Sequence, residues 1–301
     1  MLKNKAAYAL KLCGDCSIIR KDSEKEVNLM KYKLIASDLD GTLLNSDAEV
    51  TEANFKAIRE MKEMGVLFVP VTGRAMYEMP ESVYACDDIR YVISSNGSVI
   101  YDKATGEKSM IGFSFEEFKE VFAILNSYTT TMTVHCDLRS VTDAARGSEE
   151  MFEYYRLNDY YRKHIRATNV FIDNFEEYFS VDRETEMFSV FFRYEEELKA
   201  CKAELEALGY LDITASTSGN LEIIRHGALK GHAVTTLAAK LGMDLSEIIS
   251  VGDSRNDLSM IEITGLSLAT SNALDVLKEA ADEVICSNNE NIAEYIVKNY
   301  L

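Results

Sequence analysis

Residues 34–44, LIASDLDGTLL, join a short apolar run directly to an acidic turn. An apolar run of this kind is typical of a buried parallel strand, which packs against helices on both faces of its sheet. Asp38 and Asp40 are two residues apart, and in extended backbone such residues project to the same side. Gly41 permits a sharp turn, and Thr42 adds a hydroxyl beside it. We therefore expect both carboxylates to face one ligand at the end of this strand.

Strands and helices alternate on either side of this stretch. Further strands are predicted at 66–71 and 91–93, and a helix capped by Thr51 and ended by Gly65 precedes the first of them. The alternation returns from Lys230 to the C-terminus, with strands near 248–251, 266–269 and 284–285. A β-α-β-α-β order favours a parallel sheet with right-handed crossovers.

The middle of the chain, residues 113–222, has a different pattern, rich in aromatic residues. We predict helices near 115–126, 148–164 and 195–208, and strands near 131–136, 187–193, 211–216 and 220–225. Most of the aromatic side chains are expected to pack in a core rather than to stack on a ligand. This segment is predicted to be an α+β domain inserted into the parallel sheet.

The predicted fold class is therefore α/β, with a doubly wound parallel-sheet (Rossmann-like) core and an inserted domain. The core comprises residues 31–112 and 223–301, and the inserted α+β domain comprises residues 113–222. Residues 1–30 are predicted to be a peripheral extension, since the regular pattern begins only after them.

Polar sequences follow four of the predicted strands: 38–44, 71–74 (VTGR), 95–97 (SNG) and 252–257 (GDSRND). Ligands of parallel sheets bind beyond the carboxyl ends of the strands, so the acidic residues of these sequences should meet at one edge of the sheet. Asp38, Asp40, Asp253 and Asp257 would repel one another there unless a cation lies among them. Oxygen ligands in an open site indicate Mg²⁺ rather than zinc.

The net charge of the chain limits the classes of partner that it can bind. The 301 residues include 32 Lys and Arg and 50 Asp and Glu, a net charge of −18. Such a surface repels a phosphate backbone, so we expect no nucleic-acid partner. No apolar run approaches the roughly 18 residues of a membrane span, so no membrane partner is expected either. A small anionic substrate remains compatible, because a metal ion or one lysine reverses the field locally.

Cysteine usage indicates a reducing, cytoplasmic environment. The 6 cysteines are scattered, and a chain of 301 residues does not need disulfide bridges for stability. Cys13 and Cys16 form a lone CxxC without a second pair or paired histidines, so a redox or zinc role is disfavoured against a simple pair of thiols.

Taken with its spacing, the DLDGT stretch at 38–42 resembles the signature of the haloacid dehalogenase (HAD) superfamily. Thr72, Lys230 and the GDxxND stretch at 252–257 match its three later motifs in order. The long insertion before Lys230, together with Ser271-Asn272-Ala273, is similar to the Cof-type subfamily with an α+β cap. The sequence departs from that subfamily just before Asn272, where a more apolar strand followed by glycine is usual.

The resemblance implies roles for the matching residues. Asp38 would be the nucleophile and a Mg²⁺ ligand, and Asp40 the general acid and base, which also reaches the metal through its backbone carbonyl. Asp253 would complete the protein's metal ligands, with Asp257 supporting them from behind. The phosphoryl oxygens would be held by Leu39, Thr72, Gly73, Lys230 and Asn256.

Alternatives exist for several of these positions. Thr72 could simply end a strand, and Lys230 could be an exposed residue in the first turn of a helix. Arg74 could equally contact the substrate or form an ion pair at the surface. His226 and His232 flank Lys230, and we interpret them as ordinary loop and helix residues.

The function expected from this resemblance is Mg²⁺-dependent hydrolysis of a small phosphorylated metabolite, a sugar phosphate or a cofactor phosphate, through an aspartyl-phosphate. A phosphohexomutase on the same scaffold and a non-enzymatic phospho-aspartate receiver are the alternatives. Receiver domains order their acidic residues differently and lack a long insertion. The sequence leaves the metabolite and the oligomeric state open.

Overall fold

The computed structural model describes residues 31–217 and 219–301. The predicted N-terminal extension, residues 1–30, lies outside the described residues, as do Cys13 and Cys16. Within the described part of the chain, no helix is both long enough and apolar enough to cross a membrane.

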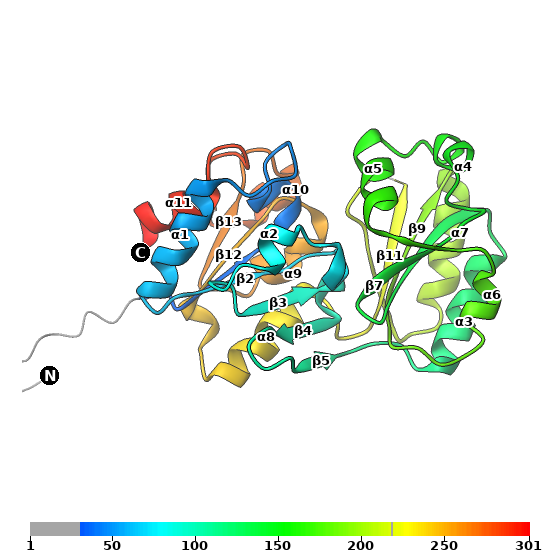
Figure 1. Ribbon diagram of the computed structural model, residues 1–301, viewed down its shortest axis with the longest axis horizontal. Helices are drawn as coiled ribbons and strands as arrows, with labels where there is room; N and C mark the ends of the chain where they lie inside the picture. Colours follow the sequence, from blue (N-terminus) through cyan, green and yellow to red (C-terminus); the bar gives the residue numbers. More distant parts are fainter. Residues whose placement is uncertain (1–30, 218) are drawn as a thin grey trace, which may run out of the picture. The chain divides into compact units, whose positions relative to one another are not determined.

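A five-stranded parallel sheet forms the core, with the strand order β14-β13-β12-β1-β2. Its strands are β1 (Leu34–Ser37), β2 (Leu67–Pro70), β12 (Ile248–Gly252), β13 (Leu266–Ala269) and β14 (Glu283–Val284). Strands from both ends of the described chain lie side by side, since Leu34 is paired with Ile248. The predicted α/β core is confirmed, and Figure 1 shows this sheet beside the second, larger sheet.

Helices cover the parallel sheet because its strands are apolar on both faces. On one face, Leu34 and Ala36 of β1 pack with Val234 and Leu237 of α8 (Lys230–Leu241). Ile35 and Ser37 therefore project to the opposite face, since neighbouring strand residues alternate. The remaining helices of this part are α1 (Glu52–Glu63), α2 (Glu81–Tyr84), α9 (Leu258–Ile261), α10 (Asp275–Ala280) and α11 (Ile292–Tyr300), and α1 packs against α11.

The third predicted strand is not a regular member of the parallel sheet. β3 (Tyr91–Ser94) lies next to the end of β2, but its parallel pairing there is limited to one bridge, between Val71 and Ile93, beside which the Thr72 N–H donates to the Ile93 carbonyl oxygen. It instead pairs antiparallel with β4 (Val99–Asp102), which pairs with β5 (Lys108–Met110). The reason is the SNG turn: Asn96 and Gly97 both have positive φ, of 57° and 109°, and this reverses the chain into β4.

A six-stranded sheet occupies the middle of the chain, in the order β10-β11-β9-β6-β7-β8. The strands are β6 (Thr130–Cys136), β7 (Arg139–Asp143), β8 (Val170–Ile172), β9 (Thr185–Phe192), β10 (Leu211–Thr214) and β11 (Asn220–Arg225). All of their pairings are antiparallel except that of β7 with β8. We call the part that carries this sheet the cap. Its predicted boundaries at 113 and 222 stay predictions, and β11 continues past 222.

The cap core is aromatic, as the sequence predicts. Helices α3 (Phe115–Asn126) and α7 (Glu195–Glu206) pack on the sheet, where Phe118 stacks on Phe179 and Phe188. The single helix predicted near 148–164 is wrong. It is two helices, α4 (Glu149–Tyr154) and α5 (Asp159–Thr168), and the side chain of Asn158 caps the second one. The short α6 (Phe175–Tyr178) follows β8.

Candidate active site

Three aspartates from the ends of two neighbouring strands converge at the carboxyl edge of the parallel sheet. Asp38 follows β1, Asp253 follows β12, and Asp257 lies in the short turn just before α9. One carboxylate oxygen from each lies within 4.8 Å of the other two. The sequence could anticipate this meeting because parallel neighbouring strands end at the same edge.

Lys230, the first residue of α8, lies among these acids. Its side chain is fully buried, and its Nζ donates to Asp38 Oδ1 at 2.7 Å and to Asp257 Oδ1 at 2.6 Å. Burial alone lowers the pKa of a lysine, but the two carboxylates outweigh it, and the pKa of Lys230 is raised. The alternative of an exposed first-turn lysine does not hold in the structure.

One ammonium group does not neutralise three carboxylates. Burial and then the neighbouring aspartates raise the pKa of Asp38 well above its usual range, against the lowering effect of Lys230. Burial and Asp257 raise the pKa of Asp253 to about 7. Such clustered acids, offering only oxygen atoms, are a suitable ligand set for a divalent cation such as Mg²⁺. Asp38 and Asp253 are the residues that would hold it.

Both carboxylate oxygens of Asp257 accept hydrogen bonds. Its Oδ1 accepts from Lys230, while its Oδ2 accepts from the backbone N–H groups of Asp253 at 3.0 Å and Ser254 at 2.9 Å. With both oxygens occupied, Asp257 fixes the backbone at Asp253 and the side chain of Lys230.

Asp40 has partners that the other acids lack. Arg74 binds its carboxylate with two donors, Nη2 at 2.6 Å and Nε at 2.8 Å, and Tyr160 of the cap helix α5 donates to the same carboxylate. Burial raises the pKa of Asp40, but the hydrogen bonds and charge of Arg74 outweigh burial, so that its pKa is lowered. Arg74 is buried and also donates to the Glu78 carbonyl oxygen, so it is not a surface residue.

Gly41 lets the first and last motifs approach each other. Its φ of +74° is in the left-handed region, and an added Cβ would lie 2.3 Å from Asp253 Oδ2. The Asn272 side chain donates to the Gly41 carbonyl oxygen at 2.8 Å. The unusual sequence before Asn272 therefore still places this side chain against the acidic turn.

Of the remaining predicted site residues, two line the pocket beside the aspartates and two are fully buried. Gly73 and Asn256 line the pocket, and Asn256 donates to Asn96 at 3.0 Å. Leu39 and Thr72 are fully buried, and the Thr72 hydroxyl accepts from the Arg74 N–H at 3.1 Å.

A pocket of about 130 Å³ lies between these residues and the cap. Core residues on its wall include Asp38, Asp40 and Arg74. The cap contributes mainly polar side chains: Thr133, His135, Tyr160, Tyr161, His164, Asn169, Ser189, Ser216 and Glu222.

Sequence reasoning missed the cap side of the site. Tyr160 reaches Asp40 across a separation of 120 residues, and Glu222 accepts from Asn96 at 2.7 Å across 126 residues. The SNG turn signalled Asn96, but no local pattern signals Tyr160 or Glu222. His226 pairs with Asp212 at 3.0 Å, and neither it nor His232 lines the pocket, as we expected.

Comparison with known proteins places the chain in a family. A model of the haloacid dehalogenase-like hydrolases matches residues 35–296. Phosphatase YwpJ of Bacillus subtilis is 30% identical over 89% of this chain and 100% of its own length. The 5-amino-6-(5-phospho-D-ribitylamino)uracil phosphatase YwtE of the same organism is 28% identical over 89% of this chain and 98% of its own.

Solved structures agree. A haloacid dehalogenase-like hydrolase from B. subtilis has a TM-score of 0.78 at 29% identity, covering 89% of this chain and all of its own. The HAD subclass IIB sugar phosphatase BT4131 has a TM-score of 0.73 at 21% identity, covering 88% and 97%, and shares the fold. The resemblance drawn from the motifs is confirmed, and the chain belongs to the haloacid dehalogenase-like hydrolases.

Proposed function

We propose that this phosphoric monoester hydrolase is Mg²⁺-dependent and acts on small phosphomonoesters, sugar phosphates or cofactor phosphates, through an aspartyl-phosphate on Asp38. The observation that carries the proposal is the convergence of Asp38, Lys230, Asp253 and Asp257, in which one lysine is shared by buried carboxylates. When bound, Mg²⁺ would neutralise the charge of this cluster and of the phosphoryl group.

Asp38 is the nucleophile in this proposal. Its carboxylate attacks phosphorus, and the ester oxygen leaves with the bonding electrons. Lys230 holds Asp38 Oδ1 at 2.7 Å, which fixes the carboxylate and brings a positive charge next to the reacting atoms. Because Lys230 is fully buried, water screens that charge little.

Asp40 is proposed as the acid that protonates the leaving oxygen and then as the base that takes a proton from water. With Arg74 and Tyr160 bound to it, its pKa is lowered and it is ionised. An incoming phosphate ester adds negative charge beside Asp40 and offers Arg74 a second anion, and both effects raise the pKa of Asp40. Protonation of Asp40 is therefore expected to accompany substrate binding.

The pocket supports a small polar substrate. Its hydroxyl, imidazole and carboxylate groups can bind the hydroxyls of a polyol or sugar. YwtE, by its name, acts on a phosphorylated ribityl compound, and BT4131 is named as a sugar phosphatase. Both substrates carry several hydroxyl groups beside the phosphate.

The test is phosphate release from a panel of sugar phosphates and cofactor phosphates, with Mg²⁺ and with EDTA. We expect release that needs the metal and is abolished in Asp38→Asn, which keeps the shape of the side chain but removes the nucleophile. The matched control is Asp87→Asn, an exposed aspartate that lines none of the cavities near the site, which should keep full activity. Most of the activity surviving in Asp38→Asn would refute the assignment of the nucleophile.

The same panel separates hydrolysis from phosphate migration. Hexose 1-phosphate should yield free phosphate. Its conversion to the 6-phosphate would instead identify a phosphohexomutase.

A further inference from the structure

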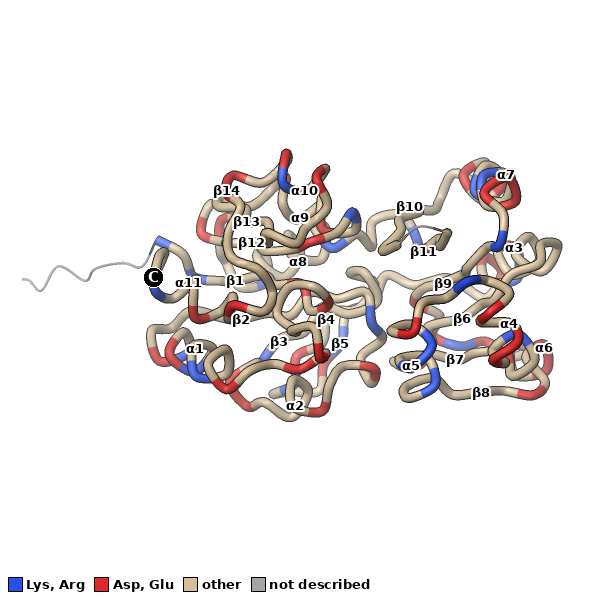
Figure 2. The backbone as a smooth tube through the Cα atoms, turned by 90° about the horizontal axis from the view of Figure 1, so that it is seen from above, with Lys and Arg blue, Asp and Glu red and all other residues tan. Residues whose placement is uncertain are grey.

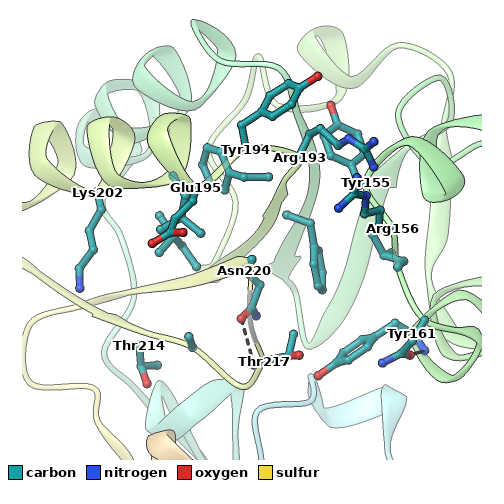
Figure 3. Close-up of a pocket in the computed structure, with 18 of the residues that line it drawn as sticks. Tyr155, Arg156, Tyr161, Arg193, Tyr194, Glu195, Lys202, Thr214, Thr217 and Asn220 are labelled. Atoms are coloured by element: carbon teal, nitrogen blue, oxygen red, sulfur yellow. Dashed lines mark hydrogen bonds between the residues drawn. The ribbon is translucent and has the colours of Figure 1, made fainter.

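A second cavity, about 950 Å³ in volume, is lined by cap residues and by Arg255 of the parallel-sheet core, and lies outside the proposed catalytic pocket. It is bounded by the α4–α5 connection, the start of α7 and the β10–β11 hairpin (Figure 3). Tyr161 and Phe191 line both this cavity and the catalytic pocket, so they form the wall between them. None of the proposed catalytic or metal-binding aspartates lines it.

The cavity gathers arginines without acidic partners. Eight of the twelve described arginines form a salt bridge with a carboxylate: Arg59, Arg74, Arg90, Arg146, Arg162, Arg166, Arg183 and Arg225. Among the described residues, Arg139, Arg156, Arg193 and Arg255 have none within 4.0 Å, and the last three all line this cavity.

Unpaired arginines are unexpected in a chain that has an excess of acidic residues. With 50 acidic residues and a net charge of −18, most cationic side chains find a carboxylate nearby, as the eight paired arginines do. Arginines that face one cavity without such partners repel one another, and an anion between them removes that cost. Figure 2 shows that acidic residues occur throughout the backbone, including α7. The cavity is therefore suited to an anion.

Arg156 also occupies an unusual backbone position. Its φ is +58°, in the left-handed region where a residue with a side chain is strained and glycine or asparagine is favoured. This bend after α4 directs the chain into the next helix and leaves the Arg156 side chain on the cavity wall. An arginine in such a position is consistent with a use for its charge there.

The walls between the cations are aromatic. Tyr155 is 5% exposed and lines the cavity, yet its buried hydroxyl has no hydrogen-bond partner among the described residues. Because that hydroxyl is buried from the cavity, Tyr155 contributes its aromatic ring to the wall. Tyr161 and Phe191 add flat apolar surface near it.

Two further charged residues line the side of the cavity that is formed by α7. In Figure 3, Lys202 and Glu195 extend from α7, whereas Arg156 and Tyr161 lie across the cavity. Glu195 is the one carboxylate on the wall, and Lys199 pairs with it at 2.6 Å. A single paired carboxylate does not make a cation site, and the excess of positive charge remains.

We infer that this cavity binds a nucleotide, with its phosphates on the arginines Arg156 and Arg193 and its flat base against the aromatic wall of Tyr155, Tyr161 and Phe191. A volume of about 950 Å³ is near the upper end of small-molecule sites, far more than one inorganic anion fills. Several cations favour several negative charges, and arginine with aromatic rings is a common surface for phosphates and flat rings.

The experiment is calorimetric titration of the full chain with ADP, without added divalent metal so that no hydrolysis is supported. We expect saturable binding in the submillimolar range. Arg156→Ala and Arg193→Ala should each weaken it by about tenfold or more, the effect of losing one charged hydrogen bond. Adenosine should bind much more weakly than ADP, because it has no phosphates.

Arg139→Ala is the matched control, since Arg139 is an exposed arginine without an acidic partner that lies away from the cavity. It should bind ADP like the parent. Arg193 donates to the Tyr154 carbonyl oxygen at 2.9 Å, so each variant is also checked by thermal melting. Arg156 has no such internal bond among the described residues, and it keeps the test valid if Arg193→Ala unfolds.

No saturable binding of ADP at millimolar concentration would overturn the inference. Unchanged affinity in folded Arg156→Ala would overturn it too, since ADP would then occupy another site, such as the catalytic pocket. Equal loss in Arg139→Ala would show a general effect of charge rather than a cavity.

Discussion

Lys230→Met tests whether one buried ammonium group holds the acidic centre together. The substitution keeps a long unbranched side chain but removes the charge and both hydrogen bonds, to Asp38 at 2.7 Å and to Asp257 at 2.6 Å. In the variant, Asp38, Asp253 and Asp257 remain within 4.8 Å of one another with no cation between them.

The size of the effect follows from the burial of these groups. Removing one partner of a buried ion pair costs about 3–5 kcal/mol, because the other charge stays buried and unpaired. In a chain of this size about 1 kcal/mol corresponds to roughly 2–4 °C in Tm, so we expect Tm to fall by about 6–20 °C without metal. Phosphatase activity should fall by at least about a hundredfold, as for loss of a donor to a reacting oxygen.

The assay is thermal melting of Lys230→Met and the parent at pH 7 and pH 5, each with EDTA and with excess Mg²⁺. The pKa of Asp38 is already raised in the folded parent, and loss of the lysine raises it further. The folded variant therefore holds protons more tightly than the unfolded chain, and its stability falls as pH rises. The deficit should be largest at pH 7 in EDTA, and smaller at pH 5 or with Mg²⁺.

The control is Lys199→Met, because Lys199 is an exposed lysine of α7 paired only with Glu195. Its Tm should equal that of the parent. A deficit below about 1 kcal/mol for Lys230→Met at pH 7 in EDTA would contradict the reasoning, since surface ion pairs are worth that much. A large deficit that is the same under all four conditions would also contradict it, because it would arise from packing rather than charge.

Three further predictions concern other parts of the molecule. Tyr160→Phe removes a hydrogen bond that lowers the pKa of Asp40, so the limbs of the kcat/KM–pH profile that depend on Asp40 should move to higher pH. The hydrogen bonds from Arg90 lower the pKa of Asp102, so ionised Asp102 stabilises the fold at pH values above the ordinary pKa of aspartate. Asp102→Asn should therefore lower Tm by roughly a few degrees at pH 7. This difference in Tm should vanish as the pH falls through the pKa of Asp102. An added Cβ at Gly231 would lie 2.0 Å from a backbone oxygen of α9, so Gly231→Ala should lower the free energy of unfolding by about 1–3 kcal/mol in denaturant titrations.

Features that depend on local pattern could be predicted from the sequence. The apolar run before Asp38 and the alternation around Lys230 indicate strands and helices because burial on two faces requires apolar residues at these spacings. The strands β1 and β12 and the helix α8 lie where these patterns placed them. The parallel core followed from the alternation of these elements, and the family followed from four short motifs in order.

Features that depend on partners far along the chain could not be predicted. The environment of Arg74 is an example, since its ion pair with Asp40 and its contact with Tyr160 join segments 34 and 86 residues away. The strand at 91–93 is another, because the positive φ of Asn96 and Gly97 reverses the chain after it and supplies an antiparallel partner, β4. Neither is visible in the spacing of apolar residues.

By itself, the sequence indicated the residues that we propose to bear the chemistry: the acids after β1 and β12, and the lysine that begins α8. Only the tertiary structure decided how their charges are balanced, with Lys230 between Asp38 and Asp257 while Arg74 and a cap tyrosine hold Asp40. The physical reason is that strand and helix signals arise from nearby residues. The protonation of a buried acid depends instead on every charge around it, whichever part of the chain supplies that charge.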